Sequence, residues 1–347
     1  MATSELILEL DDQQVRISSP EKVYFPSLHL NKADVVGYFR SVGPGILRAL
    51  HHRPTAMERW PGGVPGPDDE PQEAFYQKRL PGNAPDWVAR VEVRFPSGRT
   101  AVEVAPDNLA TVLWMANLGT LRFHPWPVRS AAPELVDQLR LDLDPQPGTG
   151  FRQAAEAAVE LREVLTEAGL TAFCKTSGGR GVHVFVRIEP SDFITARHAV
   201  IAAGRELARR RPELVTVNWW KEERGERIFL DFNQMARDRL MTSAYSIRPV
   251  PDALVSAPLT WDELTEAEPQ DFSVVTMPER FAERGDLWAE LDTVAPGSLA
   301  TLIEWYDRDA ADGEGELPYP PEYPKMPGEP PRVQPSRKNQ ANWEDPN

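Results

Sequence analysis

The sequence predicts an α/β (α+β) fold, in which short strands alternate with amphipathic helices and some neighbouring strands pair as hairpins. Three observations support this. Residues 139–145 alternate apolar and polar side chains with period two, as in a strand with one buried face. Residues 151–168 carry apolar side chains at helical spacing and are followed by Gly169. Residues 91–95 and 100–104 read as two strands of a hairpin across a Pro-Ser-Gly-Arg turn.

Composition limits the class of protein. The chain has 347 residues, enough for two domains or for one large domain with additions. It has neither an N-terminal apolar run with a charged flank nor an apolar stretch of about 18 residues, so we expect no signal peptide, no membrane span and no membrane partner. The single Cys174 excludes an intramolecular disulfide and a cysteine-cluster zinc site, and fits a reducing cytoplasm.

The formal net charge of −15 argues against a nucleic-acid partner only until its distribution is considered. Residues 251–347 contain 21 acidic and 7 basic residues, whereas residues 1–250 contain 32 and 31. The acidity therefore belongs to the last third of the chain. The first 250 residues can still contain local basic sites that contact phosphates.

The sequence of the N-terminal region predicts strands over 5–10 and 14–18. It also predicts a helix from Lys32 to about Leu50, with Asn31 as its N-cap. Lys22 and Lys32 fit ordinary surface charges when considered alone. Further on, Phe75 and Tyr76 precede two cations. Aromatic residues beside Lys and Arg suit base stacking and phosphate contact, although core residues with flanking charges are the commoner explanation.

Asp107 is predicted to cap a helix over 108–118, which ends before Gly119. In the run that follows, Arg122 and His124 flank Phe123 and share one face of a strand. His124 can donate to a phosphate. A hydrogen-bonded structural histidine explains the residue equally well.

Asp142 and Asp144 lie on the polar face of the strand over 139–145. At about 3.3 Å per residue they are roughly 6–7 Å apart along the strand, which is suitable for holding one divalent cation or sharing two. A solvated strand end that enters the turn after Pro145 is the alternative. The downstream sequence favours the metal site.

A glycine-rich loop, Ser177-Gly178-Gly179-Arg180-Gly181, joins two predicted strands. Its backbone N–H groups can converge on an anion, to which Ser177 adds a hydroxyl, Arg180 a charge and His183 a ring. The loop matches neither the Walker motif nor a dinucleotide fingerprint. Together with the carboxylate pair one helix earlier, it indicates a nucleoside triphosphate site.

The last predicted elements are a helix from Ser191 to about Arg211, a strand over 228–232 and helices around 260–267 and 278–292. Asp231 places a third carboxylate in the otherwise apolar strand, where an isolated charge is costly unless it is paired or coordinates a metal. From about Asp307 the sequence is rich in Pro, Glu and Gly and reads as an extended or disordered tail, solvated or docked along a basic groove.

Several motifs, in this order, resemble the polymerase domain of bacterial DNA ligase D and its stand-alone relatives in the archaeo-eukaryotic primase superfamily. The resemblance covers roughly residues 18–295. It rests on the motifs S-P-E-K-V-Y-F-P, R-W-P-G-G, F-Y-Q-K, L-R-F-H-P-W, L-D-L-D-P, S-G-G-R-G-V-H, F-L-D-F-N-Q and A-Y-S-I-R. It implies a mixed or antiparallel sheet flanked by helices, with an N-terminal α/β module, a primase-polymerase domain over 1–306, a catalytic core at about 85–250 and a tail over 307–347.

The resemblance also implies the roles of individual residues. The catalytic residues would be Asp142, Asp144 and Asp231, holding two divalent metal ions, Mn²⁺ or Mg²⁺. The incoming triphosphate would be bound by His124, Ser177, Arg180, His183 and Arg248, with Arg224 nearby. Phe75 would stack near the template or nucleotide, and Lys22 and Lys32 would bind the 5′-phosphate of a downstream DNA strand.

The chain also departs from the family pattern. Glu58 stands where the family often has Lys, which weakens a basic contact along the DNA path. Arg180 replaces a commoner Lys, and Ala244 stands where Pro is usual. No ligase or nuclease domain is fused to the chain, so we expect any ligase to be recruited.

We expect a monomeric, cytoplasmic and nucleoid-associated repair nucleotidyltransferase that extends a primer at short gaps or broken ends and prefers ribonucleotides. Its expected partners are gapped or 3′-overhanging DNA with a 5′-phosphate, Ku and a separate DNA ligase. A primase that starts chains de novo and a non-catalytic DNA-end-binding module that recruits a ligase are the alternatives.

Overall fold

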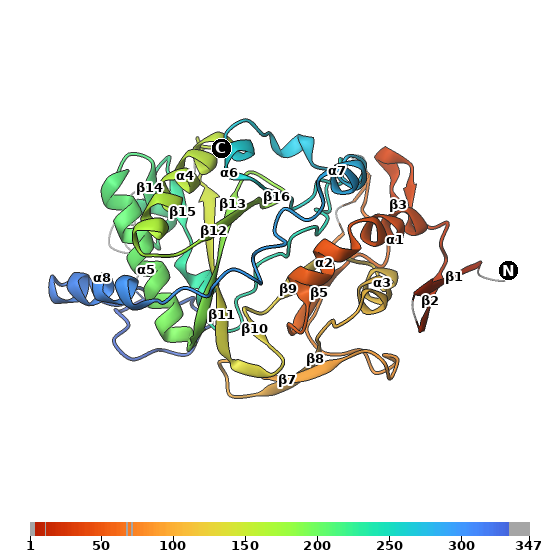
Figure 1. The fold of residues 1–347 in the computed structure, drawn as a ribbon, viewed down its shortest axis with the longest axis horizontal. Helices are drawn as coiled ribbons and strands as arrows, with labels where there is room; N and C mark the ends of the chain where they lie inside the picture. The colour runs from red at the N-terminus through yellow and green to blue at the C-terminus, as the bar shows by residue number, and fades with distance from the viewer. Residues whose placement is uncertain (1–3, 11, 67–68, 71, 333–347) are drawn as a thin grey trace.

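The computed structural model describes residues 4–10, 12–66, 69–70 and 72–332. In these ranges the strands form two main sheets and two small hairpins (Figure 1). The hairpins are β1 (Glu5–Leu10) with β2 (Gln13–Ser18), and β3 (Val23–Phe25) with β4 (Leu30–Asn31). The first hairpin confirms the two strands predicted at the N-terminus.

The larger sheet is organised around its longest strand, β11, which pairs with β13, β15 and β10. All its pairings are antiparallel except that between β14 and β15, so the sheet is mixed, as expected. Its strands are β10 (Val128–Arg129), β11 (Ala132–Pro145), β12 (Ala172–Thr176), β13 (Val182–Ser191), β14 (Val215–Thr216), β15 (Ile228–Leu230) and β16 (Pro258–Leu259). The side chains of Leu139, Leu141 and Leu143 are fully buried, which confirms the alternation predicted from the sequence.

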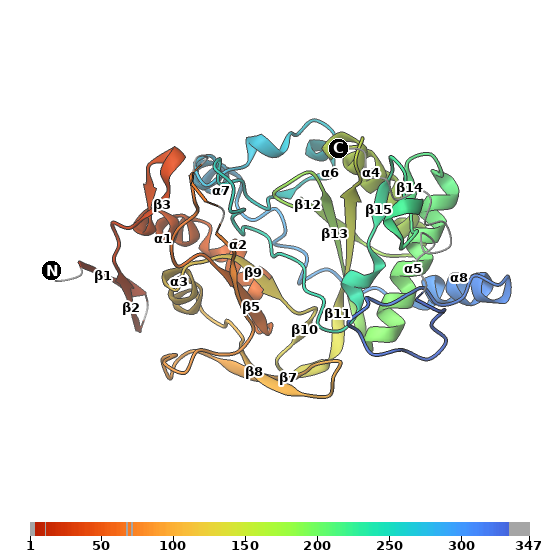
Figure 2. The same cartoon turned by 180° about the vertical axis from the view of Figure 1, so that it is seen from behind.

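The second sheet lies beside the first and is antiparallel, in the order β6-β5-β8-β7, with β9 also paired to β5 (Figure 1). Its strands are β5 (Thr55–Arg59), β6 (Phe75–Gln77), β7 (Arg90–Arg94), β8 (Thr100–Val104) and β9 (Thr120–Pro125). The predicted hairpin over 91–104 is therefore confirmed as β7 and β8. Figure 2 shows this hairpin along the lower edge of the molecule.

Helices cover both sheets. Helices α4 and α5 pack together against β11, and α8 packs on α5, whereas α1, α2 and α3 lie with the second sheet (Figure 1). The α-helices are α1 (Lys32–Ser41), α2 (Gly43–Leu50), α3 (Leu109–Asn117), α4 (Phe151–Glu167), α5 (Phe193–Arg210), α6 (Trp261–Leu264), α7 (Met277–Arg284) and α8 (Ala300–Ala311). Short 3₁₀ helices are η1 (Pro26–Leu28), η2 (Lys221–Glu223), η3 (Phe232–Met235) and η4 (Pro269–Asp271). Among the helices described, none has the length and apolar character to cross a bilayer.

Four details differ from the sequence expectations. The helix expected over 32–50 is divided after Ser41, because Pro44 lacks an N–H and its ring clashes with the carbonyl four residues earlier. Asn108, not Asp107, caps α3 by accepting from the Thr111 N–H at 2.8 Å. Asp192, not Ser191, caps α5, since the preceding residue still belongs to β13.

The fourth difference lies in the C-terminal third. The two helices expected there are shorter, and α7 ends at Gly285, whose φ of 68° is left-handed. Residues 307–311, expected in the tail, complete α8. Residues 314–332 contain no helix or strand, yet they lie against α5. Residues 333–347 of the expected tail lie outside the described part of the chain.

Candidate active site

A cavity of about 290 Å³ lies where side chains from both sheets meet. β9 of the second sheet contributes Arg122 and His124, while β11 and β13 of the larger sheet contribute Asp142, Asp144 and His183. Of the remaining lining, Gln234 comes from η3, and the other residues come from loops: Ser177, Arg180, Gly181, Leu240, Met241, Thr242 and Arg248. Carboxylates therefore face a set of cationic and hydrogen-bonding groups across one small polar space.

The acidic side of the cavity is built by β11. In its antiparallel register Asp142 lies opposite His183 on β13. The Asp231 N–H donates to the Asp142 carbonyl at 2.9 Å, which brings the third aspartate next to the strand. Asp231 itself follows the end of β15 and caps η3, rather than lying within a strand as expected. It does not line the cavity.

Burial, together with the charges of Asp231 and Asp144, raises the pKa of Asp142 to about 8. Burial also raises the pKa of Asp231. Nε2 of His183 lies 3.4 Å from Asp142 Oδ1. Burial and the neighbouring carboxylates make ionisation of Asp142 unfavourable, so a divalent cation bound here would favour its ionised form.

The carboxylates fit hard divalent cations, which prefer oxygen ligands. Within the described ranges, no three His, Cys, Asp or Glu side chains are clustered closely enough to enclose one ion. An ion held by Asp142 and Asp144 would therefore complete its shell with water or substrate phosphate oxygens, the usual arrangement for Mg²⁺.

His183 is oriented by a buried lysine. The Lys175 amino group lies 2.7 Å from His183 Nδ1 and 2.6 Å from Ser256 Oγ. Burial lowers the pKa of His183 well below its usual value, so the ring is neutral. When Lys175 donates to Nδ1, the ring proton is on Nε2, the nitrogen nearer Asp142.

Arg122 and His124 share one carboxylate. Glu58 Oε2 lies 2.7 Å from His124 Nε2 and 3.0 Å from Arg122 Nη1. Burial alone would raise the pKa of Glu58, but the hydrogen bond from His124 and the charge of Arg122 lower it. Glu58 is therefore ionised and offsets positive charge at the edge of the cavity.

Two N–H groups of the glycine-rich loop donate to the loop's own serine side chain. Ser177 Oγ accepts from the N–H groups of Gly179 at 3.2 Å and Gly181 at 3.1 Å. These N–H groups therefore converge on Ser177 and not, as expected, on an external anion. The loop presents the Ser177 hydroxyl to the cavity.

Arg248 packs across the same loop. Gly178 has a φ of 75°, and a Cβ there would lie 2.6 Å from Arg248 Cγ. Only glycine fits this backbone conformation together with so close an approach. Arg180, from the same loop, is exposed and also borders the cavity.

Arg224 lies outside the set of residues that line the cavity. Its guanidinium donates to the carbonyls of Asn218 at 3.1 Å and Trp219 at 2.8 Å and to Gln146 Oε1 at 3.3 Å. It does not line the cavity, so the structure does not bring it to the expected position beside a triphosphate. Gln146 in turn donates to Asp144 Oδ2 at 3.2 Å, which makes Arg224 a support behind that carboxylate.

Lys22 and Lys32 lie together, away from the cavity. The Lys32 N–H donates to the Lys22 carbonyl at 2.8 Å, and Lys32 Nζ donates to the Ser18 carbonyl at 2.8 Å. Burial and the charges of Lys22 and Arg59 lower the pKa of Lys32 to about 8. In the described residues no carboxylate forms an ion pair with any of these three cations.

Phe75 is 54% exposed on β6, with the Arg59 guanidinium 5.4 Å from its ring centroid. Arg59 thus connects Phe75, the expected stacking residue, with Lys22 and Lys32, which form the lysine cluster.

Sequence reasoning did not assign Arg59, Arg122, Lys175, Gln234 or Thr242 to a site. For Arg122 the signal was present, because it shares a strand face with His124. No sequence pattern marked Lys175 as a site residue, because a lysine before a loop predicts an exposed charge. Arg59 and Gln234 become site neighbours only through the tertiary fold.

Comparison with known proteins gives one consistent result. Residues 31–288 match the family model described as LigD, primase-polymerase domain. The multifunctional non-homologous end joining protein LigD of Mycolicibacterium smegmatis is 31% identical over 319 residues, covering 90% of this chain and 40% of the relative. The bifunctional non-homologous end joining protein LigD of Bacillus subtilis is 27% identical over 275 residues, covering 78% and 43%.

The fold gives the same answer. A solved structure described as the polymerase domain from Mycobacterium tuberculosis ligase D in complex with DNA matches with a TM-score of 0.74 and 31% identity. The match covers 82% of this chain and all of the other.

The fold, the polar cavity and these matches therefore define a DNA-directed nucleotidyltransferase of the repair-polymerase type. The chain belongs to the LigD primase-polymerase domain family, which confirms the resemblance found in the sequence. It spans about two fifths of the length of the first relatives.

Proposed function

We propose that this protein extends a DNA primer at short gaps or double-strand-break ends, using nucleoside triphosphates and two divalent metal ions. The primer 3′-oxygen would attack the α-phosphorus, the bond to the β-phosphate would break, and pyrophosphate would leave in line. The observation that carries the proposal is the cavity in which Asp142 and Asp144 face Arg122, His183 and Arg248.

Asp142 and Asp144, with Asp231 behind them, are the proposed metal ligands. Divalent ions bound there lower the pKa of the attacking hydroxyl and offset the charge of the leaving pyrophosphate. No protein nucleophile is required. The low pKa of His183 and the position of its Nε2 proton suit it to donate to a phosphate oxygen without competing for the metals.

The triphosphate would contact the remaining cavity groups. Arg248 and Arg180 offer forked donors, and Ser177 offers a hydroxyl. His124 is assigned to the same role, with its Nε2 already donating to Glu58. We infer a weaker, indirect part for Arg224, which would steady Asp144 through Gln146.

Lys22 and Lys32 are proposed to bind the 5′-phosphate across a gap, with Arg59 as a third cation. Three cations without a carboxylate partner in the described residues suit a dianionic phosphate. Phe75 would stack on a template base. By analogy with the named relatives, non-homologous end joining with Ku and a separate ligase is the proposed setting.

The test is nucleotide incorporation on a short-gapped duplex, with and without the 5′-phosphate, in Mn²⁺ or Mg²⁺. We expect extension that is stimulated by the 5′-phosphate and that falls on the order of 100-fold or more in Asp142→Ala. We also propose a preference for ribonucleotides, which faster addition of ribonucleotides than of deoxyribonucleotides would support and equal rates would contradict.

Two outcomes would overturn the proposal. Tight DNA binding without incorporation under either metal would indicate a non-catalytic end-binding module. Synthesis that needs no primer would indicate a primase.

A further inference from the structure

The C-terminal strap, defined as residues 313–332, is attached to the element that carries Asp231. The strap follows α8 and lies beyond residue 288, where the family match ends. Its Glu316 pairs with Arg197 and lies 2.8 Å from His198, both on α5. Arg197 is fully buried, so this pair is an internal contact and not a surface one.

Arg197 connects the strap to η3. Its Nη2 donates to the Leu317 carbonyl at 2.9 Å, and its guanidinium lies 3.8 Å from the Tyr319 ring centroid. Its Nε donates to Asn233 Oδ1 at 3.0 Å. The Asn233 amide in turn donates to the Pro318 carbonyl at 3.0 Å, so the buried Asn233 side chain is held from two directions.

Asn233 passes this constraint to the candidate metal site. Its backbone N–H donates to Asp231 Oδ1 at 3.0 Å. The Asp231 N–H is bonded to the Asp142 carbonyl, as described above. An unbroken series of hydrogen bonds therefore runs from the strap to the two aspartates.

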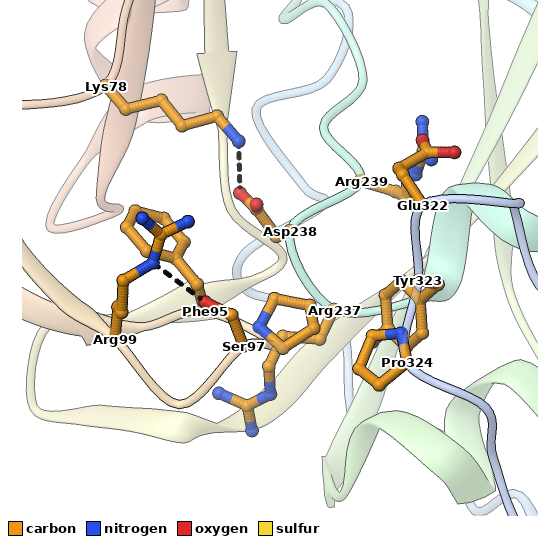
Figure 3. A pocket seen from close by; sticks show the side chains of 11 residues that line it. Lys78, Phe95, Ser97, Arg99, Arg237, Asp238, Arg239, Glu322, Tyr323 and Pro324 are labelled. Atoms are coloured by element: carbon orange, nitrogen blue, oxygen red, sulfur yellow. Dashed lines mark hydrogen bonds and ion pairs between the residues drawn. The ribbon is translucent and has the colours of Figure 1, made fainter.

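The strap makes a second attachment farther along the same segment. Glu322 pairs with Arg239, and Lys78 pairs with Asp238 at 2.7 Å from the side of β6 (Figure 3). Figure 3 shows Tyr323 and Pro324 of the strap beside Arg237, on the wall of a separate cavity of about 650 Å³. Residues 231–242, which supply Gln234 and Thr242 to the active-site cavity, are thus attached at Asn233 and again at Asp238 and Arg239.

We propose that the C-terminal strap is a positioning element for metal binding, with Glu316, Arg197 and Asn233 holding Asp231 in register with Asp142. This rests on the proposed function, because it presumes that these aspartates bind divalent ions. Removing a group that orients a metal ligand typically lowers the affinity for the metal by about 10–100-fold.

The test uses the full-length chain and Mn²⁺ binding measured by electron paramagnetic resonance without nucleotide or DNA. Glu316→Gln keeps the shape but removes the charge that orients Arg197. We expect the Kd for Mn²⁺ to rise about tenfold. The KM for the triphosphate at saturating Mn²⁺, and DNA binding without metal, should stay as in the native protein.

Glu314→Gln is the matched control, since Glu314 lies on the same strap but its carboxylate, among the residues described, pairs with Arg205 and Arg209 alone, each at 3.9 Å. It should leave the Kd for Mn²⁺ unchanged. A folded Glu316→Gln protein with the native Kd would overturn the proposal. If that variant does not fold, Asn233→Ala decides, because it removes the contacts with Arg197 and Pro318 and keeps the backbone N–H to Asp231.

Asp142→Asn separates the two proposals. If it abolishes Mn²⁺ binding while Glu316→Gln and Asn233→Ala do not change it, the positioning role alone fails. If Asp142→Asn binds Mn²⁺ like the native protein, the metal site itself is wrongly assigned.

Discussion

Lys32 is half-charged near pH 8 and mostly protonated at pH 7, because burial and two neighbouring cations lower its pKa to about 8. Below that pH it is protonated and can bind a phosphate. Above it the charge is lost, whereas a 5′-phosphate, with a second pKa of about 6, stays dianionic. The stimulation of gap filling by a 5′-phosphate should therefore be present at pH 7 and fall by up to about tenfold at pH 9.

The control for this pH effect is Lys32→Arg, since arginine stays protonated throughout that range. Gap filling by this variant should respond to the 5′-phosphate equally at both pH values. A native protein whose response is the same at pH 7 and pH 9 would show that Lys32 does not supply the binding charge.

At the scale of single elements, the glycine-rich loop sets the position of Arg248. In Gly178→Ala the new Cβ would be placed 2.6 Å from Arg248 Cγ, at a φ of 75° that costs a non-glycine residue about 1–2 kcal/mol. We expect the KM for the triphosphate to rise about tenfold, because Arg248 is pushed out of the cavity. Steady-state kinetics at saturating metal would measure this KM.

Gly98→Ala separates backbone strain from displacement of Arg248. Gly98 has a φ of 80° in the β7–β8 turn, and no atom lies within 4 Å of the position of its Cβ. This variant should lose similar stability in thermal unfolding and keep the native KM. Equal KM values for the two variants would contradict the proposed contact.

The elements also show what could be predicted from the sequence. Strand alternation located Asp142 and Asp144 on one face, because side-chain direction in a strand depends only on local spacing. The glycine loop and most helices were found for the same reason. Local patterns did not predict the break before Pro44 or the displacement of Asp231 from β15, although Pro44 itself marked the first place and Asn233 the second.

The rest of the site depends on contacts between distant segments. Glu58 meets Arg122 and His124 because β5 pairs with β9. Lys175 reaches Ser256 across 81 residues of sequence. The strap contacts α5 although its composition resembles a solvated tail, since polar contacts with the buried arginines Arg197 and Arg205, together with the buried side chain of Tyr319, hold it in place.

For the molecule as a whole, a net charge of −15 must be reconciled with a nucleic-acid substrate. Part of the C-terminal acidity is used internally, as in the pairs of Glu316 and Asp309 with arginines of α5. The lysine cluster in the N-terminal region keeps its charge available. Local phosphate contacts should therefore outweigh the long-range repulsion between the protein and DNA.

The dominance of local phosphate contacts predicts how the affinity for DNA changes with salt. The affinity for 5′-phosphorylated gapped DNA, measured by fluorescence anisotropy, should fall as salt rises, because bound phosphates release counterions. Lys32→Gln should reduce the slope of log K against log salt by about one, as expected for one lost phosphate contact. Lys221→Gln, which removes an equal charge outside the lysine cluster, should leave the slope unchanged. Affinity that instead rises with salt would mean that screening of the net negative charge, and not phosphate binding by the lysine cluster, controls association with DNA.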